Sequence, residues 1–119
     1  MNIINIFLNT VTLCICTSFA WSQTIEDFFP EQKIIASDGA ADEEFGKSVA
    51  ISGDRVIVGA YGDDDNGSYS GSAYIYEFDG ANWQETKLIA SDGAADDYFG
   101  ISVAISGDRV IVGAYGDDD

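Results

Sequence analysis

The residues best suited to chemistry in this chain are carboxylates gathered in short, glycine-rich runs. Residues 62–68 read GDDDNGS and concentrate the oxygen ligands that calcium and magnesium prefer. If a metal binds there, Asp63 and Asp65 are the expected ligands, because alternate residues of an extended loop share a side, and Asn66 is a further ligand. The run does not fit the twelve-residue EF-hand pattern. A solvated acidic turn is therefore the favoured interpretation, and the alternative is a loop that binds Ca²⁺ as a cofactor.

A second acidic run, residues 38–44, returns at residues 92–98 and offers paired carboxylates of the kind that hydrolyse glycosides. Turn formation is the better explanation, because Asp38 and Asp92 each precede a glycine and Glu44 is replaced by Tyr98 in the second run. The chain has no histidine, so a triad that uses histidine as its base is excluded. We expect no catalytic site in this chain.

Aromatic side chains suggest a third kind of chemistry. Tyr74, Tyr76 and Phe78 alternate along one expected strand and so share a face, with Trp83 shortly beyond the next turn. Such a row could stack against sugar rings, but packing inside the protein is the favoured interpretation, because large aromatics commonly supply core area. Phe45 and Phe99, each before a glycine, are also expected in the core.

Composition limits the partners of the protein. The 119 residues include 21 acidic and 5 basic side chains, and the net charge is −16. Nucleic acids and anionic membrane surfaces would be repelled, whereas proteins, neutral glycans and cations remain open as partners. A hydrophobic content of 46% is too high for a disordered acidic tail, so the charge is expected on the loops of a folded domain.

The first 22 residues carry no charge and resemble a secretory signal peptide, with small residues at Ser18, Ala20 and Ser22 near the expected cleavage point. A weak membrane anchor is the alternative, although a span normally needs about 18 apolar residues. Both cysteines, Cys14 and Cys16, lie in this leader, so the mature chain would have no disulfide. A short linker, residues 23–32, is expected to follow in a secreted or cell-surface protein.

Internal repetition organises the rest of the chain. Residues 33–65 and 87–119 differ at only four of 33 aligned positions, and Phe45 aligns with Phe99, so the period is 99 − 45 = 54 residues. The substituted pairs are Ile34/Leu88, Glu43/Asp97, Glu44/Tyr98 and Lys47/Ile101. We therefore expect a first repeat over residues 33–86 and a second, truncated repeat over residues 87–119.

Each full period predicts four strands, at residues 45–52, 55–61, 71–78 and 82–90. Gly53-Asp54 signals a tight turn between the first and second strands, and Asp79-Gly80 signals one between the third and fourth strands. Apolar residues point to both sides of the strands, which indicates a sheet covered on both faces. The expected fold class is all-β, with four-stranded antiparallel blades of the β-propeller type. Two repeats are too few to close a propeller, so further repeats or self-assembly would be needed to cover the blade faces.

The pairs Phe45-Gly46 and Phe99-Gly100, together with residues 58–61 and 112–115 (VGAY), resemble the FG-GAP repeat family, with Tyr61 and Tyr115 in place of the proline. The resemblance implies a propeller of the kind found in integrin α subunits and bacterial secreted proteins, with a role in extracellular binding or adhesion. Integrin-type repeats often carry a calcium loop between their first two strands. Here residues 52–55 (SGDR) are too short to supply the six to eight oxygen ligands of calcium.

The expected function is therefore extracellular binding or adhesion to a protein or a glycan, without catalysis. The alternative is the non-catalytic propeller portion of a larger secreted enzyme.

Overall fold

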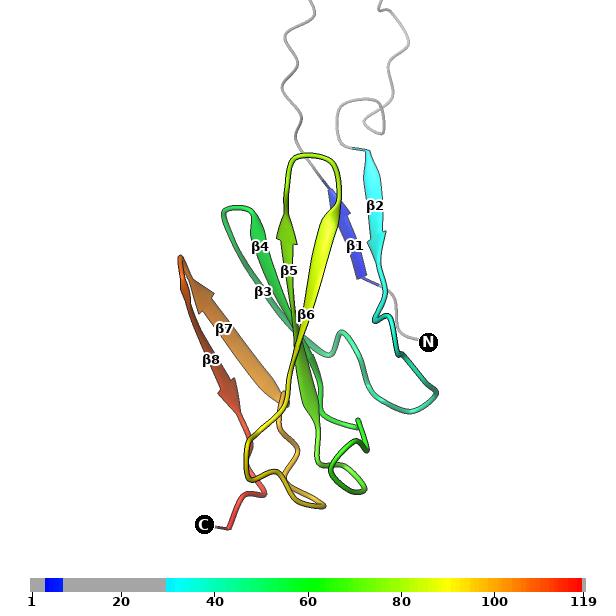
Figure 1. Ribbon diagram of the computed structural model, residues 1–119, viewed down its shortest axis with the longest axis vertical. Helices are drawn as coiled ribbons and strands as arrows, with labels where there is room; N and C mark the ends of the chain where they lie inside the picture. Colours follow the sequence, from blue (N-terminus) through cyan, green and yellow to red (C-terminus); the bar gives the residue numbers. More distant parts are fainter. Residues whose placement is uncertain (1–3, 8–29, 119) are drawn as a thin grey trace, which may run out of the picture. The chain divides into compact units, whose positions relative to one another are not determined.

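The computed structural model describes residues 4–7 and 30–118, and all of the described elements are β-strands (Figure 1). The chain divides into two compact units, one of residues 3–34 and one built mainly of residues 35–119. Among the described residues, no helix is long and apolar enough to cross a membrane. The larger unit carries the repeats and is the subject of the sections below.

The smaller unit is a two-stranded antiparallel sheet. Strand β1 (Ile4–Phe7) pairs with β2 (Glu31–Ile34) in a register that runs from Ile4 opposite Ile34 to Phe7 opposite Glu31. Strand β1 belongs to the predicted signal peptide, and β2 begins inside the predicted linker. The rest of the leader, including Cys14 and Cys16, lies outside the described residues, and its cleavage stays a prediction.

The larger unit contains one complete antiparallel blade and the first hairpin of the next. The blade has four strands in the sheet order β3-β4-β5-β6, and the hairpin pairs β7 with β8. This order confirms the four-strand period and the all-β, propeller-type fold class predicted from the sequence. The strands are β3 (Ser48–Ser52), β4 (Arg55–Ala60), β5 (Ser72–Phe78), β6 (Trp83–Leu88), β7 (Ser102–Ser106) and β8 (Arg109–Gly113).

The two turns of the blade lie where the sequence predicts them, although they differ in length. Ser52 pairs with Arg55, so the predicted two-residue turn at Gly53-Asp54 is confirmed, and Gly53 adopts the left-handed φ of 57° that such turns favour. The second turn is longer than predicted, because β5 and β6 are joined by the four residues 79–82. The Asp79 carboxylate stabilises this loop by accepting hydrogen bonds from the amides of residues 81 and 82, which lower its pKa.

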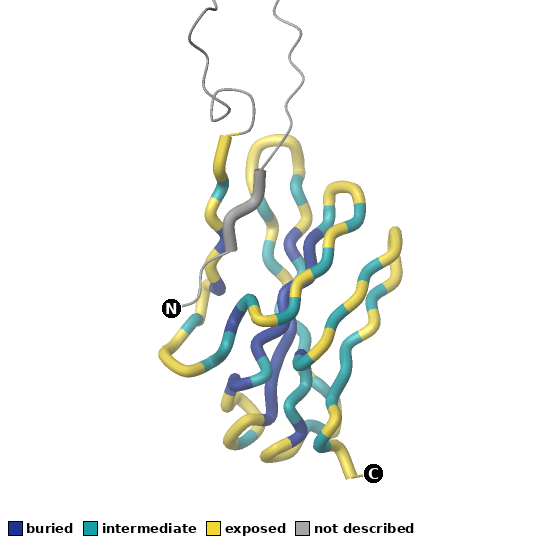
Figure 2. Tube along the Cα trace, turned by 180° about the vertical axis from the view of Figure 1, so that it is seen from behind, coloured by how far each residue is buried: buried dark blue, intermediate teal, exposed yellow. Residues whose placement is uncertain are grey.

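The core of the blade lies on its two central strands. Val56, Ile57 and Val58 of β4 are all buried although neighbouring residues point to opposite faces, which confirms the predicted two-sided burial. Figure 2 shows the buried segments concentrated along the middle of the blade. Edge strand β3 differs, because its Val49 and Ile51 are exposed. The two faces of the blade are therefore covered to different extents at this edge strand.

Aromatic rings fill one face of the blade. Tyr74 and Tyr76 are buried and stack with centroids 6.5 Å apart. The buried ring of Phe45 meets both of them edge-on, at 5.4 and 6.4 Å. Packing, the favoured interpretation of these aromatics, is therefore confirmed for the two tyrosines, which cannot serve as an open sugar platform. Phe99, the equivalent of Phe45, is only half-buried in this structure.

The two repeats meet through backbone as well as side chains. Strand β7 lies against β3, and the carbonyl of Gly100 sits where a Cβ on Gly59 would project. Gly100 itself has a φ of 92°, and a Cβ on it would overlap the carbonyl oxygen of Ser72. Only glycine allows so close an approach, and only glycine readily adopts that φ. These glycines therefore set the spacing between successive repeats.

We expect Gly59→Ala to destabilise the protein by about 2–3 kcal/mol, because the new methyl group would overlap the Gly100 carbonyl. The measurement is the free energy of unfolding in urea. Gly53→Asn is the matched control: its Cβ meets nothing within 4 Å and asparagine tolerates the turn conformation, so a change below about 0.5 kcal/mol is expected. Equal losses for the two variants would contradict this account of the repeat spacing.

Candidate functional site

Three loops lie side by side at one end of the blade (Figure 1). The amide of Gly62 donates to the carbonyl of Glu43 (3.0 Å), and the amide of Tyr98 donates to the carbonyl of Tyr69 (2.9 Å). The middle loop is thus bonded to both of its neighbours. We call this end the loop edge, and it consists of residues 35–47, 61–71 and 89–101.

Lysine 87 of β6 lies at the centre of an acidic cluster on the loop edge. Its Nζ atom donates hydrogen bonds to carboxylate oxygens of Asp38, Asp63 and Asp65, each at 2.7 Å. Asp38 comes from the first loop and the other two from the middle loop, so the ammonium joins two loops to the last strand of the blade. We call these four residues the lysine cluster.

Asp63 is the buried member of the cluster, with 1% of its surface exposed. Its carboxylate accepts further hydrogen bonds from the hydroxyls of Ser72 (3.1 Å) and Tyr74 (3.3 Å), and Tyr74 also donates to Asp38 (2.8 Å). A buried carboxylate needs such partners, because an unpaired charge away from water is strongly unfavourable. The carboxylates of the cluster are therefore paired with hydrogen-bond donors from this chain.

The charges of the cluster support one another. The hydrogen bond to Lys87 lowers the pKa of Asp38 below its usual value. Burial acts against the ammonium of Lys87, but the three carboxylates outweigh it and raise the pKa. Burial and the bond to Asp38 raise the pKa of Tyr74, which stays a neutral donor. A carboxyl group held ionised in this way is unsuited to donate a proton, as a glycosidase acid must.

Two of the three predicted metal ligands converge with a further carboxylate. Asp63 and Asp65 lie together with Asp38, which was not among the predicted ligands. The Asn66 amide donates to the Ser70 hydroxyl (3.1 Å) and helps to shape the loop. Oxygens of the three aspartates lie within 4.8 Å of one another, close enough to share a metal ion. Lys87 bonds all three, so a divalent cation would have to displace its ammonium.

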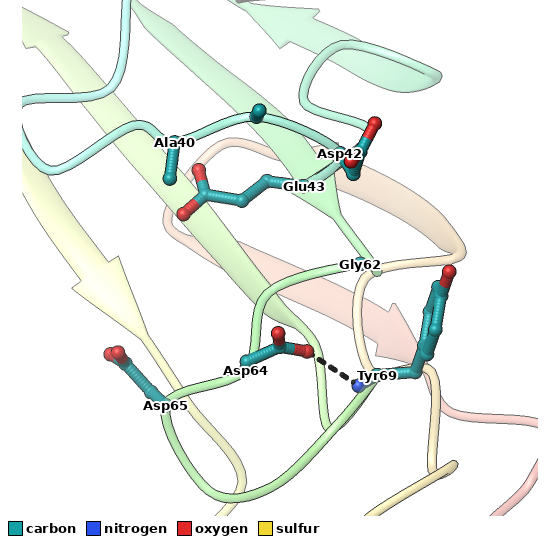
Figure 3. A pocket seen from close by; sticks show the side chains of 8 residues that line it. Ala40, Asp42, Glu43, Gly62, Asp64, Asp65 and Tyr69 are labelled. Atoms are coloured by element: carbon teal, nitrogen blue, oxygen red, sulfur yellow. Dashed lines mark hydrogen bonds between the residues drawn. The ribbon is translucent and has the colours of Figure 1, made fainter.

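A cleft of about 420 Å³ opens between the first and middle loops (Figure 3). The Asp64 carboxylate accepts a hydrogen bond from the amide of Tyr69 (2.8 Å) across its floor. One oxygen of Glu43, Oε2, is buried without a hydrogen-bond partner among the described residues. The cleft is acidic and is lined by Ala40, Ala41, Asp42, Glu43, Gly62, Asp64, Asp65 and Tyr69.

Three tyrosines of the loop edge gather with Tyr115, which follows β8, in a cluster that the sequence did not indicate. The Tyr98 ring lies 6.2 Å from that of Tyr61, 5.7 Å from that of Tyr69 and 4.8 Å from that of Tyr115, and it stacks with the last of these. Tyr69 and Tyr115 are 41% and 71% exposed. Burial and the neighbouring Tyr115 raise the pKa of Tyr98, so its hydroxyl stays protonated. We call these residues the tyrosine cluster.

Comparison with protein families identifies the chain. The family model for the FG-GAP repeat matches residues 28–76 and 83–119, which together make up more than half of the sequence. The chain belongs to the FG-GAP repeat family. A search of curated proteins and a search of solved structures found no match.

The FG-GAP motif accounts for half of the tyrosine cluster. Tyr61 and Tyr115 stand at the proline position of the motif, and Tyr98 is one of the four positions at which the two repeats differ. The tyrosines at the proline position and the difference between Glu44 and Tyr98 were therefore the two sequence signals that could have indicated the cluster. Between β3 and β4, the two-residue turn confirms that this FG-GAP chain has no room for the calcium loop of integrin-type repeats at that position.

Lys87→Met should lower the free energy of unfolding at pH 7 by about 2–3 kcal/mol, because buried Asp63 would lose its counter-ion while the exposed aspartates would lose less. The Asp38 pKa is lowered in the folded state, so the contribution of this ion pair is present above pH 3.8 and is lost as the pH falls through the lower folded value. The deficit should therefore shrink in acid, as urea unfolding at several pH values would show.

Lys33→Met is the matched control for that variant, since Lys33 occupies the same repeat position and is exposed in β2. Its effect on the free energy of unfolding should be small at every pH.

Millimolar calcium should leave the thermal midpoint of the unmodified protein unchanged and raise that of Lys87→Met, because the freed carboxylates could then bind the metal. A calcium-dependent rise in the unmodified protein would contradict the view that Lys87 holds the cluster.

The two repeats provide a second comparison at Glu43 and Asp97. The Asp97 carboxylate accepts a hydrogen bond from the Ala94 amide (2.6 Å), whereas the longer Glu43 leaves Oε2 without a partner. Glu43→Asp should therefore stabilise the protein by about 0.5–1 kcal/mol, and Asp97→Glu should destabilise it by about 1–2 kcal/mol. Urea unfolding of both variants tests this, and shifts of the same sign would contradict it.

Proposed function

We propose that this FG-GAP chain is a secreted or cell-surface binding module that holds an extracellular protein or a neutral glycan against its loop edge. The tyrosine cluster is the observation that carries the proposal. Tyrosine supplies a large apolar surface with a polar tip and few rotatable bonds, which makes it effective in binding sites. In the cluster these rings are partly exposed and touch one another, so they offer a continuous contact surface.

The backbone beneath the cluster favours binding as well. Tyr69 and Tyr98 belong to different loops, and the hydrogen bond between their backbones holds these two loops together beneath the rings. A surface that is already ordered loses less conformational entropy when a partner binds. The loop edge therefore needs little rearrangement to bind a partner.

The charge of the chain narrows the class of partner. A net charge of −16 and the acidic cleft beside Tyr69 oppose sulfated or phosphorylated ligands. Neutral sugars can stack on the tyrosine rings, and protein surfaces with exposed lysine or arginine can meet both the rings and the carboxylates. The charge-free segment of residues 1–22 supports export of the chain as its route to such partners.

The side chains of the loop edge support binding rather than catalysis. Asp38 and Asp63 are engaged by Lys87, and the sequence supplies no histidine to act as a base. The role of the carboxylates in this proposal is to anchor the loops and to repel anionic ligands.

Tyr98→Glu, which installs the residue found at the same position of the first repeat, should weaken binding about tenfold or more by removing the central ring of the cluster. The probes are an array of neutral oligosaccharides and a panel of extracellular matrix proteins, with binding constants measured for any that bind. Glu44→Gln changes the charge of the equivalent position without removing a ring, and it should bind as the unmodified chain does. Unchanged binding by Tyr98→Glu would contradict the proposal.

A further inference from the structure

Two lysine side chains of the larger unit already place their ammonium groups on tyrosine rings. The Nζ atom of Lys47 lies 4.9 Å from the centre of the Tyr61 ring and donates a hydrogen bond to the hydroxyl of that ring (3.0 Å). The Nζ atom of Lys87 lies 5.3 Å from the centre of the Tyr74 ring. The electron-rich face of an aromatic ring attracts a cation at such distances. Tyrosines of this chain therefore bind primary ammonium groups in two places.

The second repeat keeps the first of these rings but replaces its lysine. Tyr115 occupies the position of Tyr61, whereas Ile101 occupies the position of Lys47. The backbone around the two tyrosines matches: the glycine after each tyrosine donates a hydrogen bond to the first loop of its own repeat, at 3.0 Å in the first repeat and 3.1 Å in the second. The difference between the repeats therefore lies in the side chain, and Tyr115 has no lysine at the position from which Lys47 reaches Tyr61.

A second substitution adds an aromatic ring to the same place. Tyr98 stands where the first repeat has Glu44, and its ring stacks on that of Tyr115 with centroids 4.8 Å apart. Burial, the neighbouring Tyr115 and the Asp96 carboxylate together raise the pKa of the Tyr98 hydroxyl, so a negative charge acts on this ring. Asp96 is exposed. A stacked ring pair beside an exposed carboxylate favours a cation as its ligand.

The lysines of the larger unit are engaged elsewhere. Lys87 is bonded to three carboxylates and Lys47 to Tyr61, so neither is available to Tyr115. A neighbouring repeat does not close this position either. Tyr61 is half-buried and still binds Lys47, although Tyr98 of the second repeat lies beside it at 6.2 Å. A tyrosine at this position is thus accessible to an ammonium group when another repeat packs against it.

We propose that the stacked rings of Tyr98 and Tyr115 bind the ammonium group of a lysine side chain on a partner protein, in the position that Lys47 takes on Tyr61. Clefts that bind small molecules enclose most of the ligand, whereas Tyr115 and the adjacent Tyr69 are exposed. A lysine on a protein surface brings further contacts with the loop edge. The net charge of −16 attracts such a surface. This inference rests on the proposed function and narrows its partner to a protein with exposed lysines.

The test measures binding of a synthetic peptide, in which lysines alternate with glycine and serine, to the chain of residues 1–119 by titration calorimetry. The same peptide with acetylated lysines lacks the ammonium groups and should bind at least about tenfold more weakly. Tyr98→Leu removes a ring without changing the charge and should weaken binding of the lysine peptide about threefold to tenfold. Tyr98→Phe keeps the ring and should bind as the unmodified chain does.

Exchanging residues between the repeats separates ring binding from general attraction to an acidic chain. Ile101→Lys gives the second repeat the lysine of the first, so its ammonium should occupy the rings and weaken peptide binding about threefold to tenfold. Ile89→Lys makes the same change at an exposed position of the loop edge outside the tyrosine cluster, and it should weaken binding less. Lys47→Ile should free Tyr61 and tighten binding more than Lys33→Ile, which removes the same charge from β2.

Three results would overturn the inference: no binding of the lysine peptide, binding that survives acetylation or Tyr98→Leu undiminished, or equal losses for Ile101→Lys and Ile89→Lys. The proposed function is judged separately, by the oligosaccharides and matrix proteins tested with Tyr98→Glu. If one of those binds through Tyr98 while the lysine peptide does not, the binding surface stands and its assignment to lysine fails. If none of them needs Tyr98 and the peptide fails too, both proposals fall.

Discussion

The close approach of backbone between successive repeats is the constraint on which the rest of the structure depends. Gly59 and Gly100 touch without side chains between them, and the approach of Gly71 to Phe99 extends the contact. Because β7 then lies directly against β3, Ile57 is buried and both faces of β4 are covered. The same contact brings the loop after β6 against the loop before β5, and this alignment creates the loop edge.

Much of this architecture could be predicted because it is local or periodic. The alternation of apolar residues and the Gly53-Asp54 turn predict the strands, and the near-identity of the repeats predicts that whatever holds for one blade recurs in the next. The site was harder to predict. Asp38, Asp63 and Lys87 are far apart in sequence and meet only because the sheet places β6 beside the loops. No local pattern encodes such a meeting.

The lysine cluster also changes how an acidic FG-GAP loop should be interpreted. Carboxylates at this density suggest a metal, yet here the cation is an ammonium supplied by the same chain. A lysine is tethered to its strand, so the cluster that it holds does not depend on the metal concentration. The tyrosines differ from the carboxylates in this respect. Tyr61 and Tyr115 stand at the proline position of the motif and Tyr98 at the position of a glutamate in the first repeat, and the cluster stays partly exposed.

Near-identical repeats have a kinetic consequence. Strands β4 and β8 share the sequence RVIVG, so the side chains of β5 cannot tell one from the other as the chain folds. What favours β4 is connectivity: the eleven residues 61–71 close a short loop between β4 and β5, and short loops form at a smaller entropic cost than long ones. Misfolding by strand exchange is a characteristic hazard of repeat proteins. In this chain the middle loop of the loop edge is also the element that favours the correct strand pairing.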